Sequence, residues 1–347
     1  MTGAGMTGSG MTTSVNTELQ ELAESVFGDA ASSDTGFDAG LWRTLEETGL
    51  ARLTLPADAG GSEGTFEDAA VVLAAAGAHA ARVPLVETDL LGGWLLHAAG
   101  VPLPDGPLTA VAGRLEVDGT TVRGELPRVP WARDSAGVAV LTGAHVVLLD
   151  PRAAGITEGT NLAEEPRDTV AVAGPAVAVV AAPDSVAAEL RLRAALGRAL
   201  LLAGAARGAL AAGVRYAGER VQFGRPIGRF QAVQQQLALA AGEVAAASAA
   251  ASAAARVAAD VGFAAPATRL AVAAAKSRAG EAAGAVARIV HQVHGAIGFT
   301  REHDLRLWTT RLWAWREEDG SDAEWNTDLG ATVLAAGPAG LWPLITG

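Results

Sequence analysis

Arg220-Val-Gln-Phe-Gly-Arg-Pro-Ile-Gly-Arg-Phe-Gln231 is the most informative stretch of this chain, and Gln292-Val-His-Gly-Ala-Ile-Gly-Phe-Thr300 is its counterpart further along. The first stretch separates two long segments of helical spacing, so it predicts a turn between two helices, with a guanidinium and an amide at its ends. In the second stretch glycines follow a helical segment, which is typical of a backbone that comes close to another group. Both stretches therefore predict polar groups presented by the turns of a helical bundle.

The C-terminal half has helical spacing almost throughout. The pattern predicts helices over 185–222, 229–261 and 268–294, and a fourth that begins in Leu305–Trp315. We expect Ser185 to be the N-cap of the first helix. Alanine dominates these helices, so each buries little area and needs several close partners. The composition favours a four-helix bundle that also packs in an oligomer.

The N-terminal third shows helical spacing, and the middle of the chain shows a shorter period. Helices are predicted over 18–27, 39–48, 66–76 and 90–99. Short runs rich in Val, Leu and Thr then predict strands, and Val117-Asp-Gly-Thr120 predicts a hairpin turn between two of them. The predicted strands cover 108–112, 115–117, 121–125, 138–141, 146–149 and 170–180, the last of which Gly174-Pro175 could divide in two.

These patterns predict an α+β protein that is mostly α. We expect a disordered tail over 1–16 and an N-terminal helical domain over 17–106. A small middle β domain over 107–185 and a C-terminal four-helix bundle over 186–347 would follow.

Composition narrows the function. The chain has 347 residues, a net charge of −12 and no cysteine. The negative charge argues against nucleic acid and an anionic membrane surface, and the absence of cysteine excludes a disulfide framework and Cys-ligated metal. The N-terminus lacks the regions of a signal peptide, and Arg198 and Arg207 interrupt the apolar stretch 194–213. We therefore expect a cytoplasmic protein with neither a membrane nor a nucleic acid as partner.

The order of domains and the two stretches resemble the acyl-CoA dehydrogenase family over nearly the whole chain. Leu41–Leu50, followed by Leu55-Pro-Ala-Asp-Ala-Gly-Gly61, looks like the family's N-terminal helix and turn. The resemblance implies α,β-desaturation of an acyl-CoA thioester, FAD as hydride acceptor and an electron-transferring flavoprotein as electron acceptor. Each flavin in this family touches two subunits, which implies a dimer or tetramer of like or unlike chains.

The resemblance also implies residues that contact FAD. Arg220 matches the arginine that binds the FAD pyrophosphate of the neighbouring subunit, Phe223 belongs to the same segment, and Gln231 matches a glutamine at the start of the next helix. From the residues alone, Arg220 could instead cap its own helix or pair with Glu219. Gln231 could be an ordinary polar residue at a helix start, and Phe223 could lie at least partly in the core.

The second stretch matches the family's Gln-x-x-Gly-Gly segment, which lies against the ADP part of FAD. Gln292 and Gly295 fit that pattern, and Ala296 replaces its second glycine. The added methyl group makes a close approach of the backbone less certain at this point. From the residues alone, Gly295 could be a helix C-cap.

The catalytic base is expected in a later turn. Counting from the second stretch without a gap, the family's Glu-Gly-Thr segment falls on Asp319-Gly320-Ser321. Asp319 would then remove the α-proton of the thioester, and Ser321 would contact the cofactor. Glu317 and Glu318 are weaker candidates for the base, and the segment could instead be a solvated charged turn. Other family members carry the base near the position of Arg193-Ala194, where this chain has no carboxylate and Glu189 is out of register.

The middle domain departs from the family. It has no Thr-Glu-Pro segment, and Val129-Pro-Trp-Ala132 stands where the family has a flavin-adjacent Trp-x-Thr, so its Trp could equally pack the β core. We therefore expect a subunit that shares its FAD site with a partner chain. The alternatives are a self-sufficient homo-oligomeric dehydrogenase that uses Asp319, and a non-catalytic structural subunit with a relic fold.

A histidine group in the second half invites a metal interpretation. His291 and His294 lie on one helical face, and His303 follows nearby. Without cysteine or a suitably placed carboxylate, we expect structural histidines and no metal site.

Overall fold

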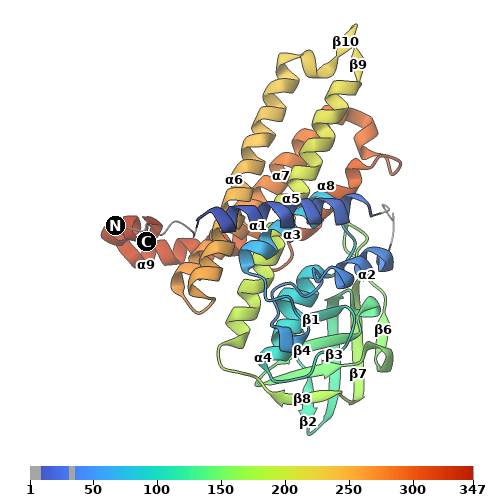
Figure 1. Cartoon of the computed structure of the whole chain (residues 1–347), viewed down its shortest axis with the longest axis vertical. Helices are drawn as coiled ribbons and strands as arrows, with labels where there is room; N and C mark the ends of the chain where they lie inside the picture. The colour runs from blue at the N-terminus through green and yellow to red at the C-terminus, as the bar shows by residue number, and fades with distance from the viewer. Residues whose placement is uncertain (1–8, 31–35, 347) are drawn as a thin grey trace, which may run out of the picture.

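The computed structural model describes residues 9–30 and 36–346, and it places the N-terminal helices across the middle of the molecule (Figure 1). The predicted helices of this region are present. They are α1 (Ser9–Gly28), α2 (Ala39–Glu47), α3 (Phe66–Ala78) and the helical turns η2 (Val86–Gly93) and α4 (Trp94–Ala98). Since α1 begins at Ser9, residues 9–16 of the expected tail are placed in this helix, and residues 1–8 lie outside the described residues.

Two four-stranded sheets form the middle of the chain. The first has the order β1 (Leu108–Ala112), β4 (Gly137–Thr142), β5 (His145–Leu149) and β8 (Ala178–Ala181). The second has the order β2 (Glu116–Asp118), β3 (Thr121–Pro130), β7 (Arg167–Pro175) and β6 (Gly155–Thr157). Strand β6 was not predicted from the sequence.

The inner faces of the two sheets share a core of small apolar side chains. Val122 and Leu126 of the second sheet pack in one buried cluster with Val138 and Val147 of the first. The predicted hairpin turn is confirmed, because Asp118 pairs with Thr121 and Gly119 takes a φ of 58° that glycine adopts at little cost. The run over 170–180 is two strands, one of the two possibilities that the sequence left open, but Gly174-Pro175 lies within β7 and the strands part after it.

The C-terminal part is a bundle of long helices. Its members are α5 (Val186–Glu219), α6 (Gln231–Val261), α7 (Pro266–His294), α8 (Leu305–Trp315) and α9 (Asp322–Thr346). A glycine on α5 explains how closely the bundle meets α3, because a Cβ at Gly204 would lie 2.1 Å from the carbonyl oxygen of Ala74. Ser185 occupies the N-cap position of α5, as predicted, but its φ is 65° and its side chain makes no capping hydrogen bond.

Two helices are long and apolar enough to cross a membrane by length and composition, and they differ in burial. In the most apolar window of α5, 83% of the residues are buried within this chain, which makes α5 a core helix. In the corresponding window of α6, 28% are buried. The alanine-rich outer face of α6 is therefore open in a single chain.

Candidate functional site

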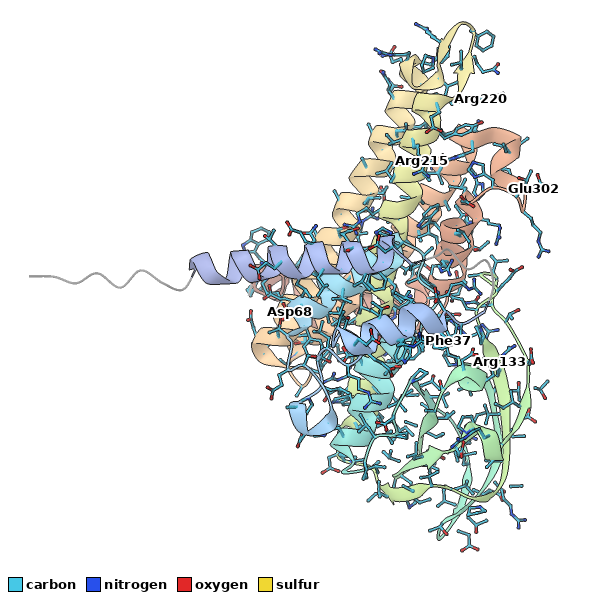
Figure 2. The ribbon with its side chains drawn as sticks, turned by 45° about the vertical axis from the view of Figure 1, so that its right-hand side comes forward. Phe37, Asp68, Arg133, Arg215, Arg220 and Glu302 are labelled. Carbon is cyan, nitrogen blue, oxygen red and sulfur yellow. The ribbon has the colours of Figure 1, made fainter. Side chains whose placement is uncertain are left out.

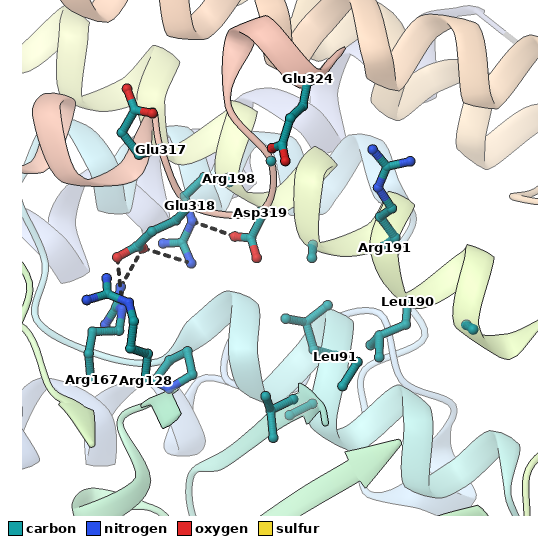
Figure 3. A pocket seen from close by; sticks show the side chains of 17 residues that line it. Leu91, Arg128, Arg167, Leu190, Arg191, Arg198, Glu317, Glu318, Asp319 and Glu324 are labelled. Carbon is teal, nitrogen blue, oxygen red and sulfur yellow. Dashed lines mark hydrogen bonds and ion pairs between the residues drawn. The ribbon is translucent and has the colours of Figure 1, made fainter. Parts of the chain in front are cut away.

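A pocket of about 620 Å³ lies between the strands and the bundle (Figure 3). One side is apolar and is formed by Leu91 of η2, by β1 and by Leu190 and Ala194 of α5. The other side is charged. It carries the carboxylates Glu317, Glu318, Asp319 and Glu324 and the guanidinium groups Arg128, Arg167, Arg191 and Arg198.

Asp319, the predicted base, lines this pocket in the turn between α8 and α9. The turn has left-handed backbone at two successive residues, with φ of 57° at Asp319 and 90° at Gly320. The indole N–H of Trp325 donates to the Asp319 carbonyl at 3.0 Å. The Asp319 carboxylate accepts a hydrogen bond from Nε of Arg198 at 2.8 Å. The carboxylate is thus fixed by a cation inside the pocket.

Arg198 joins this carboxylate to a buried ionic network. Its side chain is 4% exposed, and its Nη2 lies 3.1 Å from Glu87 and 3.6 Å from Glu318. Arg167 donates to Glu318 at 2.6 Å. Burial opposes ionisation of Glu318, but Arg167 and Arg198 outweigh it and hold the pKa of this carboxyl at about 2. Burial raises the pKa of the Glu87 carboxyl, with Arg198 as its main opposing charge.

A buried lysine donates hydrogen bonds to the backbone of the same turn. Lys276 of α7 is fully buried, and its Nζ donates to the carbonyls of Arg316 at 3.0 Å and Gly320 at 2.6 Å. Burial lowers the pKa of the Lys276 ammonium to about 8. Because both of these acceptors are carbonyls on either side of Asp319, this ammonium shapes the turn that carries Asp319.

The second position that the family uses for a base carries no carboxylate. Ala194 lines the pocket. Arg193 beside it forms an ion pair with Glu189, whose carboxylate accepts a hydrogen bond from Arg193 Nε at 2.8 Å. Glu189 is not among the pocket residues. The carboxylates among the described pocket residues therefore come from the turn between α8 and α9 and from the first turn of α9.

Ser321, predicted to contact the cofactor, lies at the start of α9. Its backbone N–H donates to the Glu324 carboxylate at 2.8 Å, and its Oγ accepts from the Glu324 N–H at 3.3 Å. This reciprocal pair caps the first turn of α9. The hydroxyl is thus used locally, and Ser321 is not among the pocket residues.

Arg220 lies at the opposite end of the molecule from the two four-stranded sheets (Figures 1 and 2). Arg220 ends α5, Gln231 begins α6, and a tight hairpin of β9 (Val221–Gln222) and β10 (Arg225–Pro226) joins them. Both side chains are exposed, and within the described residues Arg220 has no ion pair with Glu219. The ends of this turn thus present a guanidinium and an amide to the outside.

Phe223, at the tip of the same hairpin, is not a core residue. Its side chain is 91% exposed, and its φ is 54°. Its ring meets the Phe230 ring edge-on, with 6.1 Å between the ring centroids. The expectation that Phe223 is partly buried is wrong in the single chain.

The second stretch forms the end of α7 and the short helix η6 (Gly295–Phe299). Gln292, Gly295 and Ala296 are exposed. Gly295 has a φ of 66° and its N–H donates to the carbonyl of His291, so it is a helix C-cap. A Cβ at Gly295 would meet nothing within 4 Å, so the backbone is open to an outside group. None of these residues lines the pocket that contains Asp319.

The residues therefore fit one end of FAD and not the other. The exposed Arg220 suits the diphosphate, and the backbone at Gly295 leaves room for a group that packs against it. In the β domain, Trp131 is 3% exposed and stacks edge-on against Phe37 with 6.5 Å between centroids, and Ala132 is fully buried. This segment packs the core and offers no hydroxyl to an isoalloxazine ring.

The histidines form a packed aromatic group. His294 Nδ1 lies 2.7 Å from the Val290 carbonyl, and its ring stacks on Tyr216 at 4.4 Å. His291 stacks on Phe299 at 4.4 Å. Burial lowers the pKa of both imidazoles, which favours their neutral forms. Within residues 9–30 and 36–346 no group of three or more His, Asp or Glu has an arrangement for a metal ion.

Comparisons with known proteins give a consistent result. Residues 190–329 match the family described as "Acyl-CoA dehydrogenase, C-terminal domain". The chain is 32% identical over 286 residues to Acyl-CoA dehydrogenase IpdE2 of Mycolicibacterium smegmatis, across 81% of this chain and 84% of the relative.

Solved structures share the whole architecture. A chain of the ChsE4–ChsE5 complex from Mycobacterium tuberculosis has a TM-score of 0.81 at 24% identity, covering 96% of this chain and 99% of that one. A variant of the Tcur3481–Tcur3483 steroid ACAD has a TM-score of 0.80 at 26% identity, covering 94% and 99%. The first of these likenesses shows the fold, which agrees with the predicted α+β architecture.

Proposed function

The chain belongs to the acyl-CoA dehydrogenase family, and we propose that it is the subunit that completes an FAD site on a partner chain. The family supports oxidoreductase activity on acyl-CoA thioesters. When FAD is bound, it supplies the hydride acceptor for α,β-desaturation. This chain would bind the diphosphate and ADP end of the cofactor, with an electron-transferring flavoprotein as the eventual electron acceptor.

The separation of the two sets of site residues carries the proposal. Arg220 and Gln231 lie at the tip of the bundle, and Asp319 lies in the pocket beside the strands (Figures 2 and 3). The tip residues thus face outward rather than into this chain's own pocket, and they suit a cofactor held mainly by another chain. The exposed Phe223 ring beside Arg220 offers that chain an apolar anchor.

The open face of α6 supports an assembly. Large apolar side chains remain outside on this helix, with Leu239 60% exposed and Val261 55% exposed. Small alanine side chains around them permit close approach of another helix. Two similar solved structures carry paired names, ChsE4–ChsE5 and Tcur3481–Tcur3483, and the first is a complex. We propose an oligomer with a second acyl-CoA dehydrogenase-like chain.

In this role the Asp319 carboxylate acts as a fixed anion. Its hydrogen bond to the buried Arg198 neutralises two charges that would otherwise face the pocket. To accept a proton from a substrate, a general base must either break its hydrogen bond to such a cation or have another lone pair free. The network around Arg198 therefore supports a structural role for Asp319 in this chain.

The test is flavin retention by the purified complex. Arg220→Ala should lower the ratio of flavin to protein, because the diphosphate loses a bidentate donor. Arg229→Ala removes an exposed arginine from the same tip and serves as the matched control. Equal flavin content in wild type, Arg220→Ala and Arg229→Ala would refute the half-site. Colourless wild-type protein in every oligomer would instead favour a non-catalytic structural subunit.

The second candidate is a self-sufficient homo-oligomeric dehydrogenase, and the position of Asp319 in an acyl-sized pocket favours it. This candidate predicts flavin in the chain purified alone. It also predicts that Asp319→Asn abolishes turnover while flavin stays bound.

A further inference from the structure

Arg128 is placed in the pocket by an irregularity in β3. The register between β3 and β7 shifts between Leu126 and Val129, and Arg128 within this bulge has a φ of 56°. A left-handed arginine costs about 1–2 kcal/mol relative to extended backbone, so the surrounding structure must impose it. Bulges redirect side chains in this way. The result is a guanidinium that lines the pocket wall (Figure 3).

Arg128 differs from the three other arginines of the pocket. Arg167 and Arg198 are neutralised by Glu318 and Asp319, and Arg191 pairs with Asp328 at 3.0 Å. For Arg128 the described part of the chain supplies no side-chain hydrogen bond or ion pair. Arg128 also lies close to Arg167 along the sheet. Arg128 is on β3 and Arg167 on the adjacent β7, and Pro130, two residues after Arg128, pairs with Arg167.

The carboxylates of the pocket are already engaged. Glu318 and Asp319 are bound by the arginines named above, and Glu324 caps α9 through Ser321. Glu317 lies 3.1 Å from Arg316. Among the arginines of the pocket wall, the exposed Arg128 is thus the one that the described residues leave without a carboxylate partner, while Leu91 and Leu190 give the pocket an apolar part.

We propose that this pocket binds an acyl-CoA whose acyl group ends in a free carboxylate, with Arg128 as the group that receives that carboxylate. A guanidinium fork matches a carboxylate through two parallel hydrogen bonds. The apolar side of the pocket suits the methylene groups between the carboxylate and the thioester. The inference rests on the proposed function for the acyl-CoA class alone, and it holds whether or not Asp319 removes a proton.

The test is a calorimetric titration of the oligomer as purified with glutaryl-CoA, pentanoyl-CoA and free CoA. The two acyl groups have the same number of carbons and differ in the terminal carboxylate. Wild type should bind glutaryl-CoA more tightly than pentanoyl-CoA. Arg128→Gln should weaken glutaryl-CoA by roughly tenfold, as expected for a hydrogen-bonded charge, and leave pentanoyl-CoA unchanged. Arg123→Gln removes an exposed arginine of the same strand that lies outside the pocket, and it should change neither.

Three results would overturn the inference. Equal affinity of wild type for the two thioesters would show that no carboxylate is received. An equal loss for both thioesters and free CoA in Arg128→Gln would assign Arg128 to a CoA phosphate. Loss of flavin in Arg128→Gln would assign it to the cofactor. Flavin absorbance of the same samples keeps the two proposals separate, because the half-site depends on Arg220 and the carboxylate preference on Arg128.

Discussion

Asp319→Asn separates a structural role of this carboxylate from a catalytic one. The substitution keeps the size of the side chain and one acceptor for Arg198, but it removes the charge from a 2.8 Å ion pair. The Asp319 side chain is 24% exposed and that of Arg198 is 4% exposed, so solvent screens the pair only in part. Loss of a charged hydrogen bond of this kind should lower the free energy of unfolding by about 1–2 kcal/mol. Turnover of the complex should stay close to that of wild type.

Two assays measure the two roles. Urea unfolding followed by tryptophan fluorescence gives the change in stability, and acyl-CoA-dependent reduction of an artificial electron acceptor gives turnover. Glu317→Gln is the matched control, because Glu317 lines the same pocket with a side chain that is 61% exposed. A working general base contributes roughly 10²–10⁴-fold to the rate. A loss of that size in Asp319→Asn with unchanged stability would refute the structural role.

Three further changes probe the network and the packing beneath it. The pKa of Glu318, about 2, lies below its ordinary 4.5, so the stability that its ionised form contributes is present above pH 4.5 and is lost as the pH falls toward 2. In an acid titration followed by tryptophan fluorescence, Glu318→Gln should therefore lose less stability over this range than wild type. The pKa of Lys276, about 8, lies below its ordinary 10.5, so the unfolded chain binds more protons between these values and the free energy of unfolding should rise from pH 8 to pH 10.5. Urea unfolding of Lys276→Met should show a smaller rise over the same range. Gly204→Ala should lower the free energy of unfolding by about 1–3 kcal/mol, because its Cβ meets the Ala74 carbonyl. Gly242→Ala, whose Cβ has nothing within 4 Å, should be neutral or stabilising. Equal effects of the two changes on the unfolding midpoint would contradict this packing.

The elements that the sequence predicted well have strong periodic signals. The long helices α5, α6 and α7 repeat their apolar spacing over many turns, and the Asp-Gly turn at 118–119 marks the β2–β3 hairpin. Strand β6 has only three residues, too few for alternation to show. The cap at Ser185 was predicted from residue type, but its left-handed φ turns the side chain away from the capping geometry.

Asp319, which counting along the chain selected as the base, lines a pocket, and the turn at Arg220 was found from its composition. The role of each of these residues stays a prediction. The network around Arg198 was missed because its partners Asp319 and Glu87 are 121 and 111 residues away in sequence. One signal was available: an arginine inside an apolar helix must find a buried anion, since burying an unpaired charge is very costly. Arg128 gave no signal, because the bulge that redirects it depends on the pairing of β3 with β7.

The most direct measurement of the central claim is the visible flavin absorbance of this chain, purified alone and again after co-expression with a second acyl-CoA dehydrogenase-like chain. The account predicts colourless protein from the chain alone and yellow protein from the complex, because Arg220 and Gly295 serve only one end of the cofactor. Yellow protein from the chain alone would contradict the shared site and favour the self-sufficient enzyme.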